Sequence, residues 1–150
     1  MERYSEYKDS GAQWLGKIPK HWDVIKAKYL WNEVFSFSEN GSENLLSVSQ
    51  YDGVSEYNGI VSPAYCVYRL KKAANPKFMH YLYKTPMYLA EFARHSTGVI
   101  PSRWRMYTDD FGQVLTLIPP IDEQDKIVSY LYKVTSKIDE AIAQQQKMID

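Results

Sequence analysis

Basic and aromatic side chains between residues 63 and 107 are the part of this chain best suited to binding another molecule. The stretch holds eight Lys or Arg residues and one acidic residue, whereas the 150-residue chain balances 18 basic with 18 acidic residues. Lys and Arg bind phosphate groups and aromatic rings contact bases or sugars, so this mixture favours a nucleic-acid surface. The alternative is a solvated basic face whose aromatic rings lie in the core. The basic residues are Arg69, Lys71, Lys72, Lys77, Lys84, Arg94, Arg103 and Arg105, and the aromatic residues include Tyr65, Tyr68, Tyr81, Tyr83, Tyr88, Trp104 and Tyr107.

Sequence motifs for catalysis or metal binding are missing. His21, His80 and His95 lie far apart, and no HExxH or CxxC spacing accompanies them. The glycines form no phosphate-binding pattern, and Ser102 lies in no GxSxG motif. The acidic residues between 109 and 125 fit turns and a helix start more simply than a metal site. We therefore expect a protein that is not an enzyme and that carries no cofactor or metal; the alternative is an enzyme whose site is assembled only by the tertiary structure.

The single cysteine, Cys66, bears on the compartment. One cysteine excludes a disulfide within the chain, which favours a reducing compartment, and its apolar surroundings predict a buried thiol. No window approaches the roughly 18 apolar residues that a membrane span requires. We expect a cytoplasmic protein without a membrane partner.

Residues 1–118 predict one α+β domain, a small mixed sheet with short helices. The segment 24–30 fits a strand leading into a short helix, and 45–49, 64–70 and 114–118 fit further strands. Asn75-Pro76 and Thr85-Pro86 each place a capping residue before a proline, which predicts two helix starts. The segment 95–102 is predicted as a loop, and Asp109-Asp110 as a turn.

Residues 119–150 predict a long helix of the coiled-coil type. Pro119 and Pro120 end the preceding strand, and acidic residues follow in the first turn, where the helix dipole favours them. Apolar residues recur at heptad spacing, and Lys133, Lys137 and Glu140 fall outside that stripe. The stripe predicts helix pairing; the alternative is a helix folded back on its own domain. The stripe consists of Ile127, Leu131, Val134, Ile138, Ala141, Gln145 and Met148.

Several segments, taken in order, resemble the specificity subunits of type I restriction-modification systems. The opening segment includes YKDSG at 7–11, WLG at 14–16, IP at 18–19 and HW at 21–22. The later segments are GIVSPAY at 59–65, STGVIPSR at 96–103 and IPPIDEQ at 118–124. The later segments look like the second part of a target recognition domain and its junction with the conserved helix of that family.

The resemblance implies a non-catalytic subunit that reads one half of a bipartite DNA site. Its helix would act as a spacer that docks modification and restriction subunits, and the modification subunit would bring its own S-adenosylmethionine. The chain would pair as a homodimer or with the helix of a second recognition domain. The DNA-binding residues implied are Arg69, Lys71, Lys72, Ser102, Arg103, Trp104 and Arg105. For Arg103 the alternative is an ion pair with Asp109 or Asp110.

One departure from the family opens a second interpretation. In the family a longer stretch separates the strand that resembles 45–49 from the segment that resembles 59–65, whereas here only residues 50–58 intervene. Part of the DNA-binding surface would then be missing. The chain would be a shortened assembly module that dimerises through its helix without reading DNA.

Overall fold

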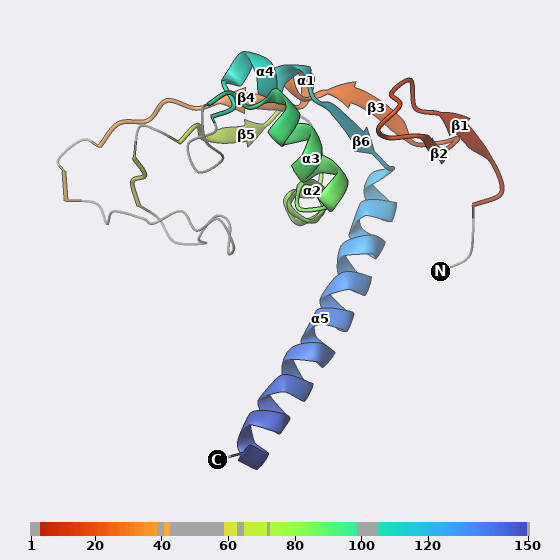
Figure 1. Ribbon diagram of the computed structural model, residues 1–150, viewed down its shortest axis with the longest axis vertical. Coiled ribbons are helices and arrows are strands. Elements are labelled where there is room, and N and C mark those ends of the chain that lie inside the picture. The colour runs from red at the N-terminus through yellow and green to blue at the C-terminus, as the bar shows by residue number, and fades with distance from the viewer. Residues whose placement is uncertain are drawn as a thin grey trace.

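The computed structural model of the chain describes residues 4–38, 41–42, 59–62, 65–71, 73–98 and 105–149, with side chains up to Lys147. Within them the chain is α+β, as the sequence predicts, and it ends in a long helix (Figure 1). The predicted strand at 45–49 lies outside the described residues. The elements are β1 (Tyr7–Asp9), β2 (Lys17–Pro19), β3 (Asp23–Lys26), α1 (Ala27–Leu30), β4 (Trp31–Glu33), β5 (Tyr68–Leu70), α2 (Pro76–Tyr83), α3 (Pro86–His95), α4 (Thr108–Gln113), β6 (Leu115–Ile118) and α5 (Ile121–Ile149).

The strands form three antiparallel pairs, β1–β2, β3–β6 and β4–β5, rather than one mixed sheet. The pair β3–β6 joins segments far apart in the sequence, with Asp23 opposite Ile118. It lies in the middle of the domain, while β1–β2 and β4–β5 occupy opposite ends (Figure 1). Because β6 leads directly into α5, the long helix begins beside the residues that precede β3.

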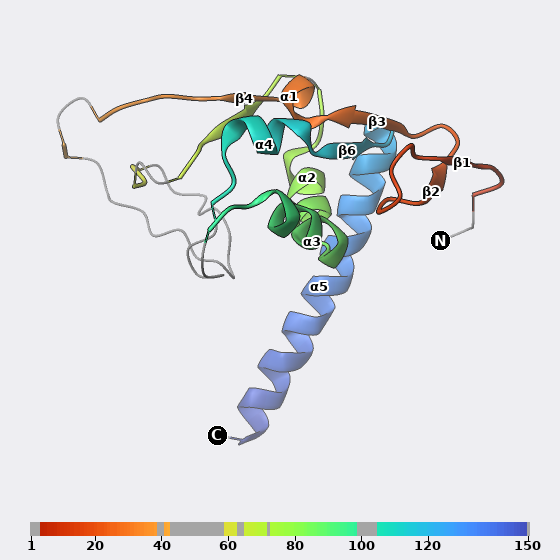
Figure 2. The same cartoon turned by 45° about the horizontal axis from the view of Figure 1, so that its top comes forward.

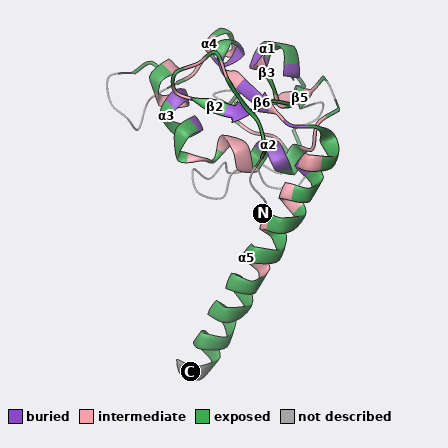
Figure 3. Ribbon diagram, turned by 90° about the vertical axis from the view of Figure 1, so that its right-hand side faces the viewer, coloured by how far each residue is buried: buried purple, intermediate pink, exposed green. Residues whose placement is uncertain are grey.

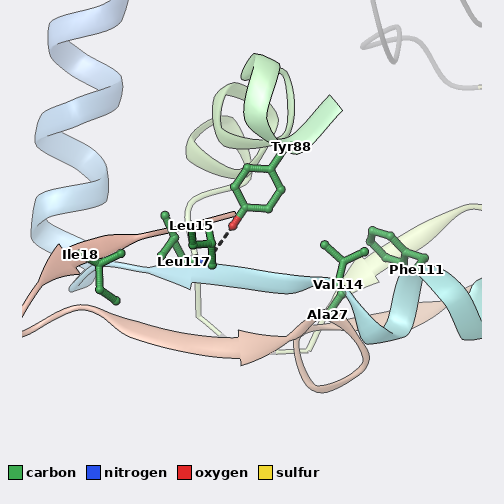
Figure 4. Packing of buried hydrophobic residues seen from close by; sticks show 7 residues of the cluster. All are labelled: Leu15, Ile18, Ala27, Tyr88, Phe111, Val114 and Leu117. Atoms are coloured by element: carbon green, nitrogen blue, oxygen red, sulfur yellow. Dashed lines mark hydrogen bonds between the residues drawn. The ribbon is translucent and has the colours of Figure 1, made fainter. Parts of the chain in front are cut away.

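Tyr88 on α3 is the centre of the main core and is fully buried. Its hydroxyl donates to the Leu115 carbonyl at 3.1 Å. It also accepts from the Leu117 amide at 3.0 Å, the bond drawn as a dashed line in Figure 4. Strand β6 pairs with β3 on one edge only. On its other edge, the Tyr88 hydroxyl supplies hydrogen bonds to backbone groups that a further strand would otherwise bind. The Trp14 ring meets the Tyr88 ring edge to face, with 5.1 Å between centroids.

A second core cluster anchors the start of α5. Leu30, Phe78 and Met79 are buried, and Ile127 and Val128 of α5 pack against them. Figure 2 shows α2 beside the upper part of α5, while the rest of that helix extends away from the domain. The alternative prediction is a helix folded back on its own domain. Only the first turns of α5 pack on the domain in this way.

The two proline-marked helix starts are confirmed, with one difference in capping. Asn75 Oδ1 accepts from the amides of Lys77 and Phe78 at 2.9 and 3.1 Å, a true N-cap for α2. Thr85 precedes α3 but does not cap it, because its hydroxyl donates to the Leu82 carbonyl instead. Pro86 alone marks that start by its fixed φ.

Two local predictions are wrong. Asp109 and Asp110 lie in the first turn of α4 rather than in a turn, where negative charge favours the helix and where Phe111 follows into the core. Cys66 is exposed rather than buried. Strand β5 begins only at Tyr68, so Cys66 precedes the part of the segment that the β4 pairing holds against the domain.

Candidate nucleic-acid interface

The ribbon β4–β5 carries two of the predicted DNA-binding residues. Arg69 is exposed in the middle of β5, opposite Asn32 of β4. Lys71 follows the strand; its amide donates to the Leu30 carbonyl and its Nζ to the Lys28 carbonyl, each at 2.8 Å. The Lys71 ammonium is thus held at α1 by the Lys28 carbonyl. The Arg69 side chain is exposed to solvent.

A third predicted residue, Arg105, closes the base of the predicted loop. It forms an isolated antiparallel bridge with Thr97, in which each backbone amide donates to the other's carbonyl at 2.8 and 2.9 Å. Arg105 is itself exposed. The other four predicted residues, Lys72, Ser102, Arg103 and Trp104, lie outside the described residues, and so does any ion pair of Arg103.

A polar network braces the ribbon against α4. The Thr108 hydroxyl lies 2.6 Å from Glu33 Oε2 and 2.8 Å from the Tyr68 hydroxyl. Burial raises the pKa of Tyr68 to about 12, and the Glu33 charge adds to that effect. Tyr68 therefore stays neutral and serves as a hydrogen-bonding group. The network borders a half-open hollow of about 340 Å³, which also reaches Lys28, Trp31, Asn32, Lys71, Asp109 and Gln113.

The aromatic residues of the basic stretch divide between core and surface. Tyr83 and Tyr88 pack on each other, with 5.3 Å between ring centroids, and burial raises the pKa of both hydroxyls. For these rings the core alternative is confirmed. Tyr65 and Tyr107 are about half exposed, at 49% and 58%. Only such exposed rings are free to stack on a base or sugar.

One basic residue of the stretch is committed to an internal ion pair. Arg94 binds the buried Glu91 through two bonds of 2.7 and 2.8 Å, and His95 Nε2 lies 3.1 Å from the same carboxylate. Arg94 holds the pKa of Glu91 below its ordinary value, against the opposing effect of burial. The Arg94 side chain is nevertheless 65% exposed, so the pair lies at the surface of α3.

The predicted pairing stripe of α5 changes its environment along the helix. Ile127 packs on the domain and Leu131 is half-buried, but Val134 and Ile138 are 38% and 52% exposed. Ala141 and Gln145 are exposed as well. Figure 3 shows the outer part of α5 coloured as exposed over most of its length. The side chain of Met148 lies outside the described residues. The stripe is therefore packed against the domain at its start and exposed to solvent from Val134 onward.

Residues missed by the heptad count widen that stripe. A shallow hollow of about 550 Å³ runs along the helix and is lined by stripe residues together with Lys137, Ile142 and Gln144. Ile142 is 53% exposed and follows Ile138 by one turn. Counting apolar residues at a spacing of four as well as at heptad positions identifies it.

The exposed basic residues and the α5 stripe are features of this chain's own geometry. No family model, curated protein or solved structure matches the chain. Its resemblance to type I specificity subunits accordingly rests on the sequence segments alone.

The described residues hold neither a metal-binding group nor a membrane-spanning helix. They contain no group of three or more His, Cys, Asp or Glu side chains placed to hold a metal ion. Within the same residues, no helix is both long and apolar enough to cross a membrane. The functional proposal rests on the exposed basic residues and the α5 stripe of the described part of the chain.

Proposed function

We propose that this chain is a DNA-recognition subunit of the type I restriction-modification kind, with no catalytic role of its own. Residues 1–118 would read one half of a bipartite site, and α5 would be the spacer that pairs with a second helix. The observation that carries the proposal is the solvent-exposed apolar stripe on α5 beyond Leu131. A helix of this length with an uncovered apolar face is stabilised by a partner helix.

A second copy of the chain can cover the stripe in an antiparallel arrangement. With Ile138 placed opposite Ala141 of the second copy, Val134 falls opposite Gln145 and Leu131 opposite position 148. Lys137 is the one charged residue beside the stripe over residues 128–147, and in this register it faces Gln144, so no like charges meet. The two domains then lie at opposite ends of the helix pair, which suits a reader of two separated half-sites. Modification and restriction subunits would dock on this assembly, and the modification subunit would supply S-adenosylmethionine and perform methyl transfer.

The DNA face in this proposal lies at the β4–β5 end of the domain. Arg69 and Arg105 are exposed, Lys71 is held at the surface nearby in the chain, and the predicted loop follows the Thr97 bridge. Such residues contact phosphates or, in the case of Arg, the edge of guanine in the major groove. Arg94 is exposed as well, but its guanidinium is paired with Glu91 on α3.

The stripe alone also supports the second candidate function, an assembly module that no longer reads DNA. This module needs the helix pair and not the basic residues. The two functions therefore differ in DNA binding and agree on self-association.

The deciding experiment measures the mass of the full chain in solution and its binding to a random-sequence duplex. A dimer is expected, and its DNA affinity should fall steeply between about 50 and 200 mM salt because bound phosphates release counterions. Replacing Arg69 and Arg105 by Gln should weaken binding and reduce the salt slope by about two. The matched control is Lys147→Gln, which removes a charge at the far end of α5. A dimer that ignores DNA supports the assembly module, and a monomer contradicts both the assembly module and the homodimeric form of the DNA reader.

A further inference from the structure

The first turn of α5 carries three consecutive polar side chains that bind different parts of the domain. They are Glu123, Gln124 and Asp125, and two residues separate them from the double proline. Successive helical residues point about 100° apart, so three of them span more than half of the circumference. This triplet is well placed to hold the helix from two sides.

Glu123 binds the N-terminal segment of the chain. Its carboxylate accepts hydrogen bonds from the Tyr4 hydroxyl and from Trp22 Nε1, the latter at 3.1 Å, and it lies 2.8 Å from His21 Nε2. The register of β3 with β6 places Asp23 opposite Ile118 and so brings residues 21 and 22 beside the start of α5. The sequence separation exceeds 100 residues for each of these three bonds.

Gln124 and Asp125 bind the residue that starts α2. Gln124 is buried; its Oε1 accepts from the Asn75 amide at 2.9 Å, and its Nε2 donates to the Pro119 carbonyl at 2.7 Å. Asp125 Oδ1 accepts from Asn75 Nδ2 at 2.7 Å. Because Asn75 also caps α2, this one residue ties the starts of both helices together.

We infer that the triplet Glu123–Gln124–Asp125 is a joint that fixes the direction in which α5 leaves the domain. The apolar contact of Ile127 and Val128 with the domain presses the helix against α2 but is not directional, since apolar packing tolerates rotation more readily than oriented hydrogen bonds do. The N-terminal segment and Asn75 restrain the helix from two different elements. The inference concerns the isolated chain and does not rest on DNA binding or on pairing.

Asp122 separates this role from simple helix stabilisation. It lies in the same first turn, carries the same charge and is exposed. Replacing Asp122 or Glu123 by Ala removes the same favourable interaction with the helix dipole. Only the Glu123 replacement also removes the bonds to Tyr4, His21 and Trp22.

The test measures the distance between spin labels at Lys28 on α1 and Lys147 near the end of α5, in a full chain with Cys66→Ser. Labelled chains are diluted with unlabelled protein so that only distances within one chain contribute. The helix runs about 36 Å from Glu123 to Lys147, so a swing of about 15° moves its tip by about 9 Å. Glu123→Ala and Asp125→Ala should each broaden the distance distribution by several ångströms, and the double variant should broaden it further.

Two controls keep the outcome decisive. Asp122→Ala should give the distribution of the parent chain, and Tyr4→Phe, which removes one hydroxyl donor from the same carboxylate, should broaden it less than Glu123→Ala. Far-ultraviolet circular dichroism confirms that each variant is folded at the measuring temperature. A folded Glu123→Ala, Asp125→Ala chain with an unchanged narrow distribution would overturn the joint, whatever its DNA binding or dimerisation.

Discussion

Glu91 is a buried carboxylate whose negative charge is held by Arg94 and His95 on the same helix. Its pKa lies below the ordinary value of 4.5, chiefly because Arg94 hydrogen-bonds to the charged form. A lowered folded pKa means that the carboxylate stabilises the fold above about pH 4.5 and that this contribution disappears as the pH falls through the folded pKa. Glu123 behaves in the same way: burial opposes the shift, but the bonds from Tyr4, His21 and Trp22 outweigh it.

Glu91→Gln should therefore lower the melting temperature at pH 7 and flatten its fall between pH 5 and pH 3. The amide of Gln does not titrate in this range, so the free energy of unfolding falls less steeply with decreasing pH in the variant. The measurement is thermal unfolding as a function of pH. Glu6→Gln is the control, because the Glu6–Lys20 pair is 65% exposed on both sides and surface pairs contribute little. Equal acid limbs in the parent chain and Glu91→Gln would contradict this role.

The Tyr88 hydroxyl is a second residue whose removal has a defined cost. Tyr88→Phe keeps the ring packing but leaves the buried Leu117 amide without its acceptor, which costs about 1–3 kcal/mol. The melting temperature should fall by roughly 5–10 °C, as measured by differential scanning calorimetry. Tyr130→Phe is the control, because Tyr130 is 54% exposed on α5. If both variants melt alike, the hydroxyl does not secure the edge of β6.

At the scale of single elements, the exposed half of α5 allows a test with matched chemistry. Ala141 lies on the stripe and Ala143 lies on the opposite side of the helix, since two residues advance the helix by about 200°. Ala141→Glu should place a charge inside the helix pair and convert the dimer to a monomer. Ala143→Glu adds the same charge to the polar side and should leave the mass unchanged. Sedimentation equilibrium distinguishes the two, and equal masses would show that the stripe is not the pairing face.

Elements with strong local signals were predictable from the sequence. Asn75-Pro76 marks the start of α2, the double proline precedes α5, and the β-formers of 114–118 give β6. In each case the deciding interaction is backbone geometry or capping within a few residues. Such signals do not depend on the rest of the fold.

The predictions that failed depend on distant partners. Asp109-Asp110 also suits a turn, and only the burial of Phe111 against the core distinguishes a helix there. Cys66 lies in an apolar run, yet the pairing of β5 with β4 stops short of it. The position of Glu123 in the first turn of α5 is predictable, but its bonds are not, because its partners Tyr4, His21 and Trp22 lie more than 100 residues away. The composition of the basic stretch likewise does not show that Arg94 forms an ion pair with Glu91.

At the scale of the whole molecule, the first two turns of α5 belong to the packing of the domain. The predicted division at residue 118 stays a prediction, but Gln124, Ile127 and Val128 pack on or bond to the domain beyond it. The candidate DNA residues of β5 lie at one end of the domain and the β1–β2 pair at the other (Figure 1). The helix leaves between these ends, so pairing along α5 leaves the β4–β5 end accessible.

Two truncations test where the folded unit ends. A chain that stops at Lys133 keeps the bonded triplet and the two apolar contacts and should melt within a few degrees of the full chain, but as a monomer. A chain that stops at Pro120 uncovers Leu30, Phe78 and Met79, losing roughly 2–3 kcal/mol of apolar burial from two half-buried side chains. It also leaves the Asn75 amide without Gln124, which costs about 1–3 kcal/mol more. Against a total stability of about 5–15 kcal/mol, this loss should lower the melting temperature by roughly 6–24 °C, as measured by circular dichroism. A chain ending at Pro120 that melts at the temperature of the full chain would show that the domain is complete without α5 and that the joint holds the helix without supporting the fold.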